Sequence, residues 1–341
     1  MLLESIWFFL WGLLWAVFFM TDGFDLGVGT LLPFLGKTDA DKRLMINSIG
    51  PLWDGNEVWL ITAGGVTFAA FPTVYAFMFS SLYTPLLLIL FALIIRGVSF
   101  EFRGKIESPA WKRLWDACIF IGSVVPSVLF GVAFANIFQG LPFDQNGYYG
   151  SLISLLNPYG ILGGALFLML FLVHGALWLA IRMPGQLQQR AASAASRLWL
   201  VLVVVAVTFL GATWVVTPLY ENYLSMPLLF VVPLITVAAL FGIKGMLVKK
   251  DFLKAWISSA ATIVGATFFC IIGLYPNLFP SNMDAAASLT AHNASASPLT
   301  LKIMLVVVLI FIPVVIAYQV WAYFMFSDRL SEKDLAAEEA Y

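Results

Sequence analysis

The chain has 341 residues, of which 61% are apolar and only 11% are charged, and its formal net charge is −1. This composition excludes an ordinary soluble domain and is typical of a polytopic membrane protein. The near-zero charge leaves no basic surface for nucleic acid, so membrane lipid and other membrane helices are the expected partners.

Nine apolar segments are long enough to cross about 30 Å of hydrocarbon, a distance that takes roughly 20 helical residues. The sequence therefore predicts an all-α polytopic membrane protein in which residues 1–341 form a single integral membrane domain. The first segment lacks the basic start and the cleavage site of a signal peptide, so we expect it to be retained as a span. The approximate spans are 5–35, 57–78, 80–99, 114–139, 157–181, 198–218, 227–247, 252–275 and 300–326.

The basic residues are segregated between alternate loops. If nine spans are correct, 16 of the 18 Lys and Arg residues lie in the loops and the tail on one side of the membrane. Cytoplasmic loops carry such an excess of Lys and Arg, so we predict that the N-terminus is outside and the C-terminus is cytoplasmic.

The first span contains two carboxylates within its apolar run. Asp22, Asp25 and Gly29 share one helix face, and Gly23 and Gly27 form a pair of small residues beside it. Lipid would solvate neither a carboxylate nor an exposed backbone, so this face should press against another helix. Ionisable residues within spans are usually functional.

Three more ionisable groups are expected at the same depth. Asp54 and Glu57 open the second span from the inner side, and Arg96 lies near the inner end of the third. Together with Asp22 and Asp25 they predict a buried charge cluster that exchanges protons with the inner aqueous phase. Two structural alternatives stay open: Asp54 and Glu57 resemble a capping box, and Arg96 would reach the headgroups by snorkelling.

Other conspicuous side chains are better explained by packing. Trp7, Trp11 and Trp15 recur at helical spacing, which is typical of helix packing or an interfacial belt. His174 is the one histidine within a span, and a lone membrane histidine is usually packed and hydrogen-bonded. We therefore assign no metal ligand, no cofactor-binding residue and no direct catalytic residue to this chain.

Two long motifs then carry a resemblance to a known family. The segments TDGFDLGVG at 21–29 and MINSIGPLWDGNEVWLITAGG at 45–65 closely resemble subunit II of cytochrome bd-type quinol oxidases. The likeness extends over the whole chain, with further matches at 120–123, 131–134, 139–140, 156–160, 280–281 and 287–290.

The resemblance implies a respiratory complex in the cytoplasmic membrane of a prokaryote. Such a complex oxidises quinol, reduces O₂ to water and generates a proton-motive force without pumping. Subunit I, the expected partner in a heterodimer, carries the cofactors: heme b at two sites and, at the third, heme d or a further heme b. Subunit II binds no heme iron, and a small single-span accessory subunit is a further expected partner in some complexes.

The resemblance also implies roles for particular residues. Asp54 matches an aspartate of a cytoplasm-facing proton route at the subunit interface. Asp25, Trp53 and Arg96 match residues associated with heme assembly or stability of the complex. Trp59 matches a tryptophan that lines an apolar O₂ route. Glu57 is a departure, because some relatives have an uncharged glutamine there; the extra carboxylate would either widen the proton antenna or strengthen a helix cap.

Two hypotheses compete with this function. In a proton-coupled secondary transporter, Asp22, Asp25 and Arg96 would bind substrate during alternating access, but the sequence shows neither inverted repeats nor interrupted spans near the midplane. A passive scaffold would only stabilise the heme subunit, and it predicts that Asp54→Asn leaves both hemes and turnover intact.

Overall fold

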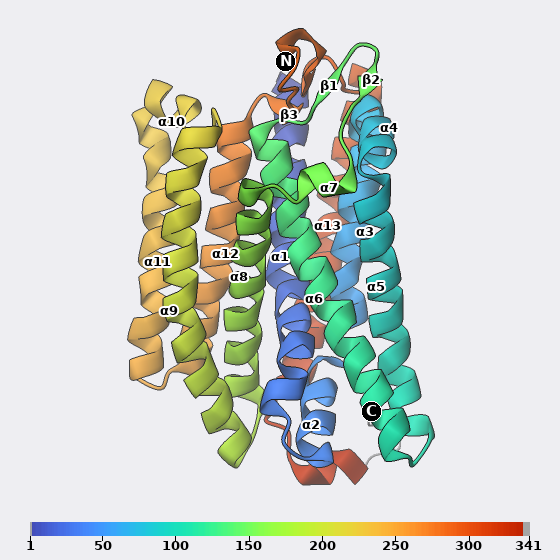
Figure 1. Ribbon diagram of the computed structural model, residues 1–341, viewed down its shortest axis with the longest axis vertical. Helices are drawn as coiled ribbons and strands as arrows, with labels where there is room; N and C mark the ends of the chain where they lie inside the picture. The colour runs from blue at the N-terminus through green and yellow to red at the C-terminus, as the bar shows by residue number, and fades with distance from the viewer. Residues whose placement is uncertain (1, 337–341) are drawn as a thin grey trace.

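Long helices run side by side along one axis of the molecule (Figure 1). The computed structural model describes residues 2–336, so residue 1 and the predicted C-terminal end at 337–341 lie outside the described residues. Within that part, eight helices are long and apolar enough to cross a membrane. They are α1 (Leu2–Leu35), α5 (Tyr83–Phe102), α6 (Pro109–Gln139), α8 (Pro158–Arg182), α9 (Gly185–Val216), α11 (Val231–Val248), α12 (Phe252–Leu274) and α13 (Pro298–Met325).

The predicted span 57–78 is not one continuous helix. It corresponds to α3 (Trp53–Ala70) and α4 (Pro72–Ser81), which follow one another along the bundle with Phe71 between them (Figure 1). Phe71 leaves the helical region, with φ −135° and ψ 65°, and Pro72 starts the next helix. The break has a local cause, because proline disfavours helical backbone in the preceding residue and lacks an N–H of its own.

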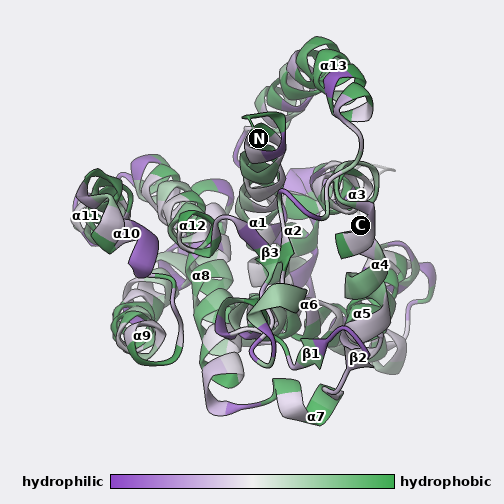
Figure 2. Cartoon of the chain, turned by 90° about the horizontal axis from the view of Figure 1, so that it is seen from above, coloured by the Kyte–Doolittle hydropathy of each residue, from purple (hydrophilic) through white to green (hydrophobic). Residues whose placement is uncertain are grey.

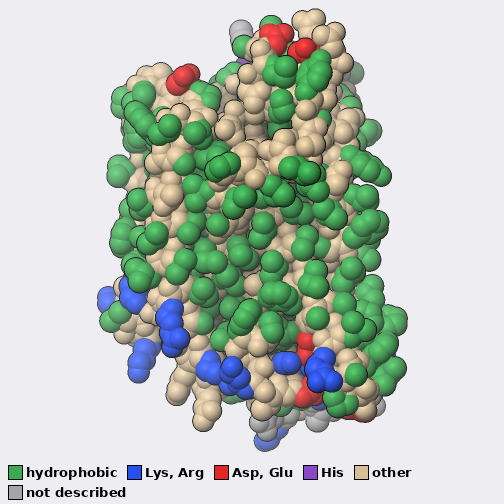
Figure 3. All heavy atoms as spheres, viewed as in Figure 1, with side chains coloured by type: hydrophobic (Ala, Val, Ile, Leu, Met, Phe, Trp, Pro, Cys, Tyr) green, Lys and Arg blue, Asp and Glu red, His purple; other side chains and the backbone are tan. Residues whose placement is uncertain are grey.

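The basic loops gather at one end of the bundle. Helix α2 (Asp39–Ile49) and η1 (Arg103–Lys105) lie at this end, which we call the basic end. Figure 3 shows apolar side chains over the flanks and Lys and Arg side chains near the basic end. Helix α1 starts at the opposite end of the bundle. The segment after α13 lies at the basic end, because Leu330 N donates to Arg182 O, at the end of α8, at 3.0 Å. Between these two points the described chain crosses the bundle an odd number of times.

Helix α1 is the centre of the bundle. It contacts α3, α6, α8, α12 and α13, and every residue from Thr21 to Leu32 is buried. Glycines permit this close packing: a Cβ on Gly27 would lie 1.9 Å from the carbonyl oxygen of Phe171 on α8. The expected packing of the small-residue face against another helix is therefore confirmed.

Helix α13 is at the edge of the bundle. Viewed from above, it stands outside α1 and α3 (Figure 2), and Leu301 is the single residue of this helix classed as buried. It is held at the end opposite the basic end by the Trp7 indole N–H, which donates to the Leu301 carbonyl at 3.0 Å. Trp11 likewise donates to Thr67 Oγ1 at 3.0 Å, so the tryptophan stripe of α1 packs helices together.

The loops contain short elements that the sequence did not predict. The loop 36–56 folds as α2, whose capping box pairs Thr38 with Asp41. At the opposite end, the loops 140–156 and 276–299 are joined by hydrogen bonds between Leu141 and residues Pro280 and Asn282. The remaining elements are the hairpin β1 (Phe143–Asp144) and β2 (Gly147–Tyr148), α7 (Leu152–Leu155), α10 (Glu221–Ser225), η2 (Pro227–Phe230), β3 (Asn277–Phe279) paired with β4 (Leu289–Thr290), η3 (Ala285–Ala287) and η4 (Glu332–Ala336).

Candidate functional site

A buried ion-paired group joins α1, α3 and α5 in the half of the bundle nearer the basic end. Arg96 Nη2 donates to Asp22 Oδ1 at 2.7 Å and to Glu57 Oε1 at 2.5 Å. The side chains of Asp22 and Arg96 are fully buried, whereas 22% of the Glu57 side chain is exposed. The site therefore runs from a partly accessible carboxylate to a fully enclosed one.

Asp25 lies one helical turn after Asp22 and is bound differently. Its Oδ2 accepts a hydrogen bond of 2.7 Å from Asn56 Nδ2, and both side chains are fully buried. Asn56 Oδ1 accepts in turn from Gln319 Nε2 at 3.1 Å and from the Tyr323 hydroxyl at 2.9 Å. We call Asp22, Asp25, Asn56, Glu57 and Arg96 the intramembrane cluster.

The intramembrane cluster contains more acidic than basic groups. One guanidinium faces three carboxyl groups, and isolated buried charges are costly unless they are paired. Among the described residues, Asp22 Oδ2, Asp25 Oδ1 and Arg96 Nε and Nη1 have no hydrogen-bond partner. Asp25 is the carboxyl group without a direct bond to Arg96, and the neutral amide of Asn56 holds it instead.

The structure decides between the alternatives left open by the sequence. Arg96 is fully buried and ion-paired, so the snorkelling interpretation was wrong. Helix α3 begins after Leu52 without a side-chain cap hydrogen bond, and Glu57 binds Arg96, so the capping-box interpretation was also wrong. Asp54 is exposed at the first turn of α3, one turn before Glu57, and it is the predicted member that stays outside the buried group.

The two tryptophans beside the intramembrane cluster lie in contacts between helices. Trp53 packs on Phe100 of α5 with ring centroids 5.4 Å apart, and a Cβ on Gly97 would lie 3.0 Å from its ring. Trp59 is 5% exposed, and its Nε1 donates to Gln319 Oε1 at 2.7 Å.

Three polar residues of this region were missed as site residues. Asn56 was present in the quoted motif, but its amide was given no role. Gln319 and Tyr323 lie in the otherwise apolar α13 at i and i+4, a spacing that places them on one helix face. This pair of polar side chains within a span was the available signal.

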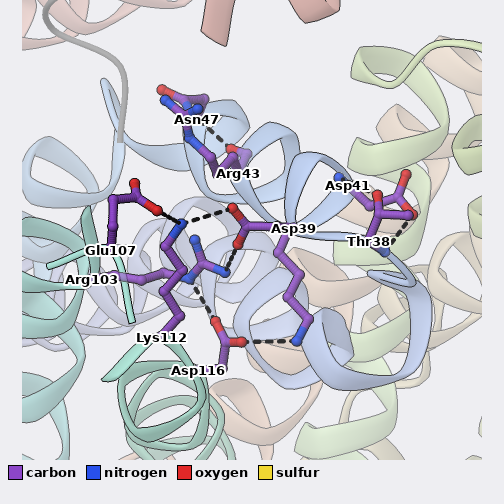
Figure 4. Close-up of polar contacts among 10 residues, drawn as sticks. Thr38, Asp39, Asp41, Arg43, Asn47, Arg103, Glu107, Lys112 and Asp116 are labelled. Atoms are coloured by element: carbon purple, nitrogen blue, oxygen red, sulfur yellow. Dashed lines mark hydrogen bonds and ion pairs between the residues drawn. The ribbon is translucent and has the colours of Figure 1, made fainter. Parts of the chain in front are cut away.

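A second ionic group lies at the basic end of the bundle (Figure 4). Arg103 donates to Asp116 Oδ1 at 2.6 Å and to Asp39 Oδ1 at 2.7 Å. Lys42 bonds Asp116 at 2.8 Å, and Lys112 bonds Asp39 at 3.2 Å. These bonds join α2 to the ends of α5 and α6, the helices that carry Arg96 and its packing partners.

The electrostatics of this ionic group follow from its bonds. Partial burial alone would raise the pKa of Asp39, but the hydrogen bonds and charges of Arg103 and Lys112 outweigh burial and hold the pKa below its usual value. Burial alone would also raise the pKa of Asp41, but the hydrogen bonds from Arg190 and from the backbone amides of Thr38 and Lys37 together outweigh burial and lower the pKa. Both groups are therefore ionised at neutral pH.

A cavity of about 100 Å³ lies on the other side of α1, between α6, α8, α9, α11 and α12. Its lining is almost wholly apolar and includes Phe19, Phe134, Phe167, Phe209 and Phe269. Trp59 is not among the lining residues of this cavity.

These features define a polytopic membrane protein in which charged groups meet inside the helix bundle. The family model for cytochrome bd terminal oxidase subunit II matches residues 3–326. Cytochrome bd-I ubiquinol oxidase subunit 2 of Escherichia coli (strain K12) is 36% identical, with 98% of this chain and 96% of that protein covered. Cytochrome bd ubiquinol oxidase subunit 2 of Bacillus subtilis (strain 168) is 38% identical, with 97% and 98% covered.

A solved structure has the same fold. A chain of the bd oxidase from Geobacillus thermodenitrificans superposes with a TM-score of 0.77, covering 96% of this chain and 99% of that chain at 16% identity. The chain studied belongs to the cytochrome bd terminal oxidase subunit II family. It is a subunit of a bd-type quinol:O₂ oxidoreductase complex and a multi-pass protein of the bacterial inner membrane, as the resemblance implied.

The family implies hemes in the complex, together with subunit I. In this chain His174 does not fit the role of an axial ligand. Its Nε2 is 3.0 Å from the Met20 carbonyl, its Nδ1 is 3.1 Å from Ser259 Oγ, and its ring stacks on Trp256 at 5.0 Å. Both ring nitrogens are engaged in a packed interior, so neither is placed to bind a heme iron.

Proposed function

We propose that the intramembrane cluster forms the inner part of a proton route that supplies O₂ reduction in the complex. The observation that carries this proposal is the gradient of exposure along three carboxyl groups. Asp54 is exposed, the Glu57 side chain is 22% exposed, and Asp22 is fully enclosed with Arg96. A proton entering from water at Asp54 would meet progressively drier groups, which is the arrangement expected of a relay.

Arg96 holds two carboxylates of the proposed proton route in place. Because Arg96 holds both Asp22 and Glu57, these carboxylates are constrained, whereas Asp25 is held by the neutral amide of Asn56. We assign the entry of protons to Asp54 and Glu57, their passage past the Arg96–Asp22 pair to Asp25, and the balancing of charge to Arg96. Glu57 connects the exposed Asp54 to the buried Arg96, because its carboxylate is bonded to Arg96.

A role in heme assembly belongs to the same geometry. Trp53 and Arg96 both act between α3 and α5, and Asp25 ties α1 to α3 through Asn56. Loss of any of these contacts would let α3 move relative to its neighbours. We propose that these contacts set the surface on which the heme-bearing subunit I assembles. A small accessory subunit would be a further partner in the complex.

The proposed direction of proton uptake depends on how the bundle is oriented in the membrane. The basic end carries the Lys and Arg residues that favour the cytoplasm, so Asp54 would face the cytoplasmic water. Protons for O₂ reduction would then come from inside while quinol oxidation releases protons outside. A proton-motive force arises from this arrangement without pumping. Trp59 would border the O₂ route.

The experiment compares Asp54→Asn with Glu101→Gln in the purified complex. Glu101 is an exposed carboxylate near the basic end of α5, so its variant controls for the loss of a surface charge. We expect Asp54→Asn to keep the hemes and to slow quinol-driven O₂ uptake several-fold, and Glu101→Gln to behave as wild type. Equal heme content and equal turnover in both variants would favour the passive scaffold.

A further inference from the structure

We propose that Gln319 and Tyr323 of α13 are positioning residues that fix the direction in which the Asn56 amide faces Asp25. This inference deepens the proposed proton route and rests on it. It assigns a specific task to a peripheral helix, since α13 is exposed to lipid or to a partner over most of its length.

The indole N–H of Trp59 sets the direction of the hydrogen bonds that run through Gln319 to Asn56. An indole N–H can only donate, so Trp59 Nε1 requires the Gln319 oxygen, Oε1, at 2.7 Å. The other end of the same amide is then an NH₂ group, and Gln319 Nε2 donates to Asn56 at 3.1 Å. The group that receives this bond has to be the Asn56 oxygen.

The same direction of hydrogen bonding extends to the Asp25 carboxylate. With its oxygen turned toward α13, Asn56 presents its NH₂ group to Asp25 Oδ2 at 2.7 Å. The Tyr323 hydroxyl adds a second donor to the same Asn56 oxygen at 2.9 Å. If the amide were reversed, its oxygen would face the carboxylate and its NH₂ group would face the NH₂ group of Gln319.

Position and packing support this role. Asn56 is fully buried, so water cannot replace the bonds from α13. The Tyr323 ring is held edge-on against Phe24 and Trp178, with centroids 6.2 Å away in each case, which fixes its hydroxyl in place. Trp7 bonds α13 at the end opposite the basic end, and Gln319 and Tyr323 bond Asn56 in the half nearer the basic end. These two attachments hold the Gln319 and Tyr323 side chains within hydrogen-bond distance of Asn56.

The test uses Tyr323→Phe, which removes one donor and keeps the ring. Tyr318→Phe is the matched control, because Tyr318 lies on the same helix with 67% exposure. Gln319→Met is the second variant, since it keeps the length of the side chain and removes both amide groups. For each complex we would measure heme content and the pH profile of quinol-driven O₂ uptake.

We expect Tyr323→Phe and Gln319→Met to keep their hemes, to lower turnover by roughly two- to tenfold and to displace the pH profile, as loss of one hydrogen bond permits. Tyr318→Phe should match wild type. In a double-mutant cycle, Tyr323→Phe should add nothing further once Asn56→Leu is present. An unchanged pH profile in both α13 variants, or full additivity with Asn56→Leu, would overturn the proposal.

The outcome is separable from that of the proton route. If Asp54→Asn turns over normally while Tyr323→Phe still displaces the pH profile, the positioning role stands and the route through Asp54 is wrong. If Asp54→Asn is slow and both α13 variants match wild type, the route stands and the positioning role is wrong.

Discussion

Arg96 is the single buried cation that balances the carboxylates of the intramembrane cluster. Its two bonds reach α1 and α3 from α5, so one side chain connects three helices. Removing one partner of a buried pair leaves an uncompensated charge, and the cost is larger than the net gain from forming the pair.

Arg96→Gln should therefore destabilise the complex by about 3–5 kcal/mol, the range found for a broken buried pair. Thermal unfolding and heme content of the purified complex would measure this effect. The double variant Arg96→Gln with Asp22→Asn removes the opposite charge as well, so it should recover part of the loss. A double variant that is no more stable than Arg96→Gln would contradict the pairing.

Asp39 allows a test by pH outside the membrane-spanning segments. Because its pKa is lowered in the folded protein, its contribution to stability is present above the unfolded value of 3.8 and disappears as the pH falls through the lower folded value. Asp39→Asn should lower the free energy of unfolding by less than about 1 kcal/mol at pH 7, because the site is largely solvated. The difference from wild type in thermal melts should shrink as the pH is lowered below 3.8; a difference that stays constant into the acid range would contradict the ion pairing of Asp39.

At the scale of single residues, the sequence identified the charged members of the site and missed the neutral ones. Asp22, Asp25, Glu57 and Arg96 stand out because charge within an apolar span is costly and needs a partner. Asn56 and Gln319 carry no charge, and their importance depends on hydrogen bonds between helices far apart in the chain. Such pairing cannot be read from local composition.

Helix elements were predicted well where burial and length dominate. The segments of α8 and α12 match their predicted ranges closely, because a membrane span needs a long apolar run. The break between α3 and α4 was missed because hydropathy does not register the backbone restriction at Phe71 and Pro72. Helix α2 was missed because its polar sequence lies in a loop and its stability comes from the cap at Thr38 and from ion pairs.

The close contact between α1 and α8 gives a prediction at this scale. Gly27→Ala would place a Cβ 1.9 Å from a backbone oxygen of α8, so the two helices would have to separate. We expect a loss of about 1–3 kcal/mol in stability, typical of an overpacked interior, together with a lower yield of assembled complex.

The control is Gly211→Ala on α9, where a Cβ would meet nothing within 4 Å. That variant should be as stable as wild type or slightly more stable, since alanine favours a helix. Thermal melts of the two complexes would separate the effects; equal melting temperatures would mean that α1 and α8 pack less tightly than the structure shows.

At the scale of the whole molecule, the functional proposal depends on which side of the membrane the basic end faces. All three carboxyl groups of the gradient lie in the half nearer the basic end, so the side of the membrane that this end faces decides which compartment supplies protons.

Single cysteines would establish the orientation. In a background of Cys118→Ala and Cys270→Ala, Ala286→Cys lies in the loop opposite the basic end and Lys249→Cys lies in a loop of the basic end. We expect a membrane-impermeant maleimide to label only Ala286→Cys in intact spheroplasts and to label Lys249→Cys once the membrane is opened. The reverse pattern would place the basic end outside and would reject the cytoplasmic proton route.

The measurement that tests the central claim most directly is proton uptake from the basic-end side during O₂ reduction. The complex would be placed in vesicles that expose this side, and a pH-sensitive dye would follow uptake after O₂ is added to the quinol-reduced enzyme. We predict that Asp54→Asn, with normal heme content, takes up protons more slowly in step with its slower O₂ reduction, while Glu101→Gln keeps the wild-type rate. Wild-type uptake kinetics in Asp54→Asn would contradict the account, because protons would then not enter through Asp54.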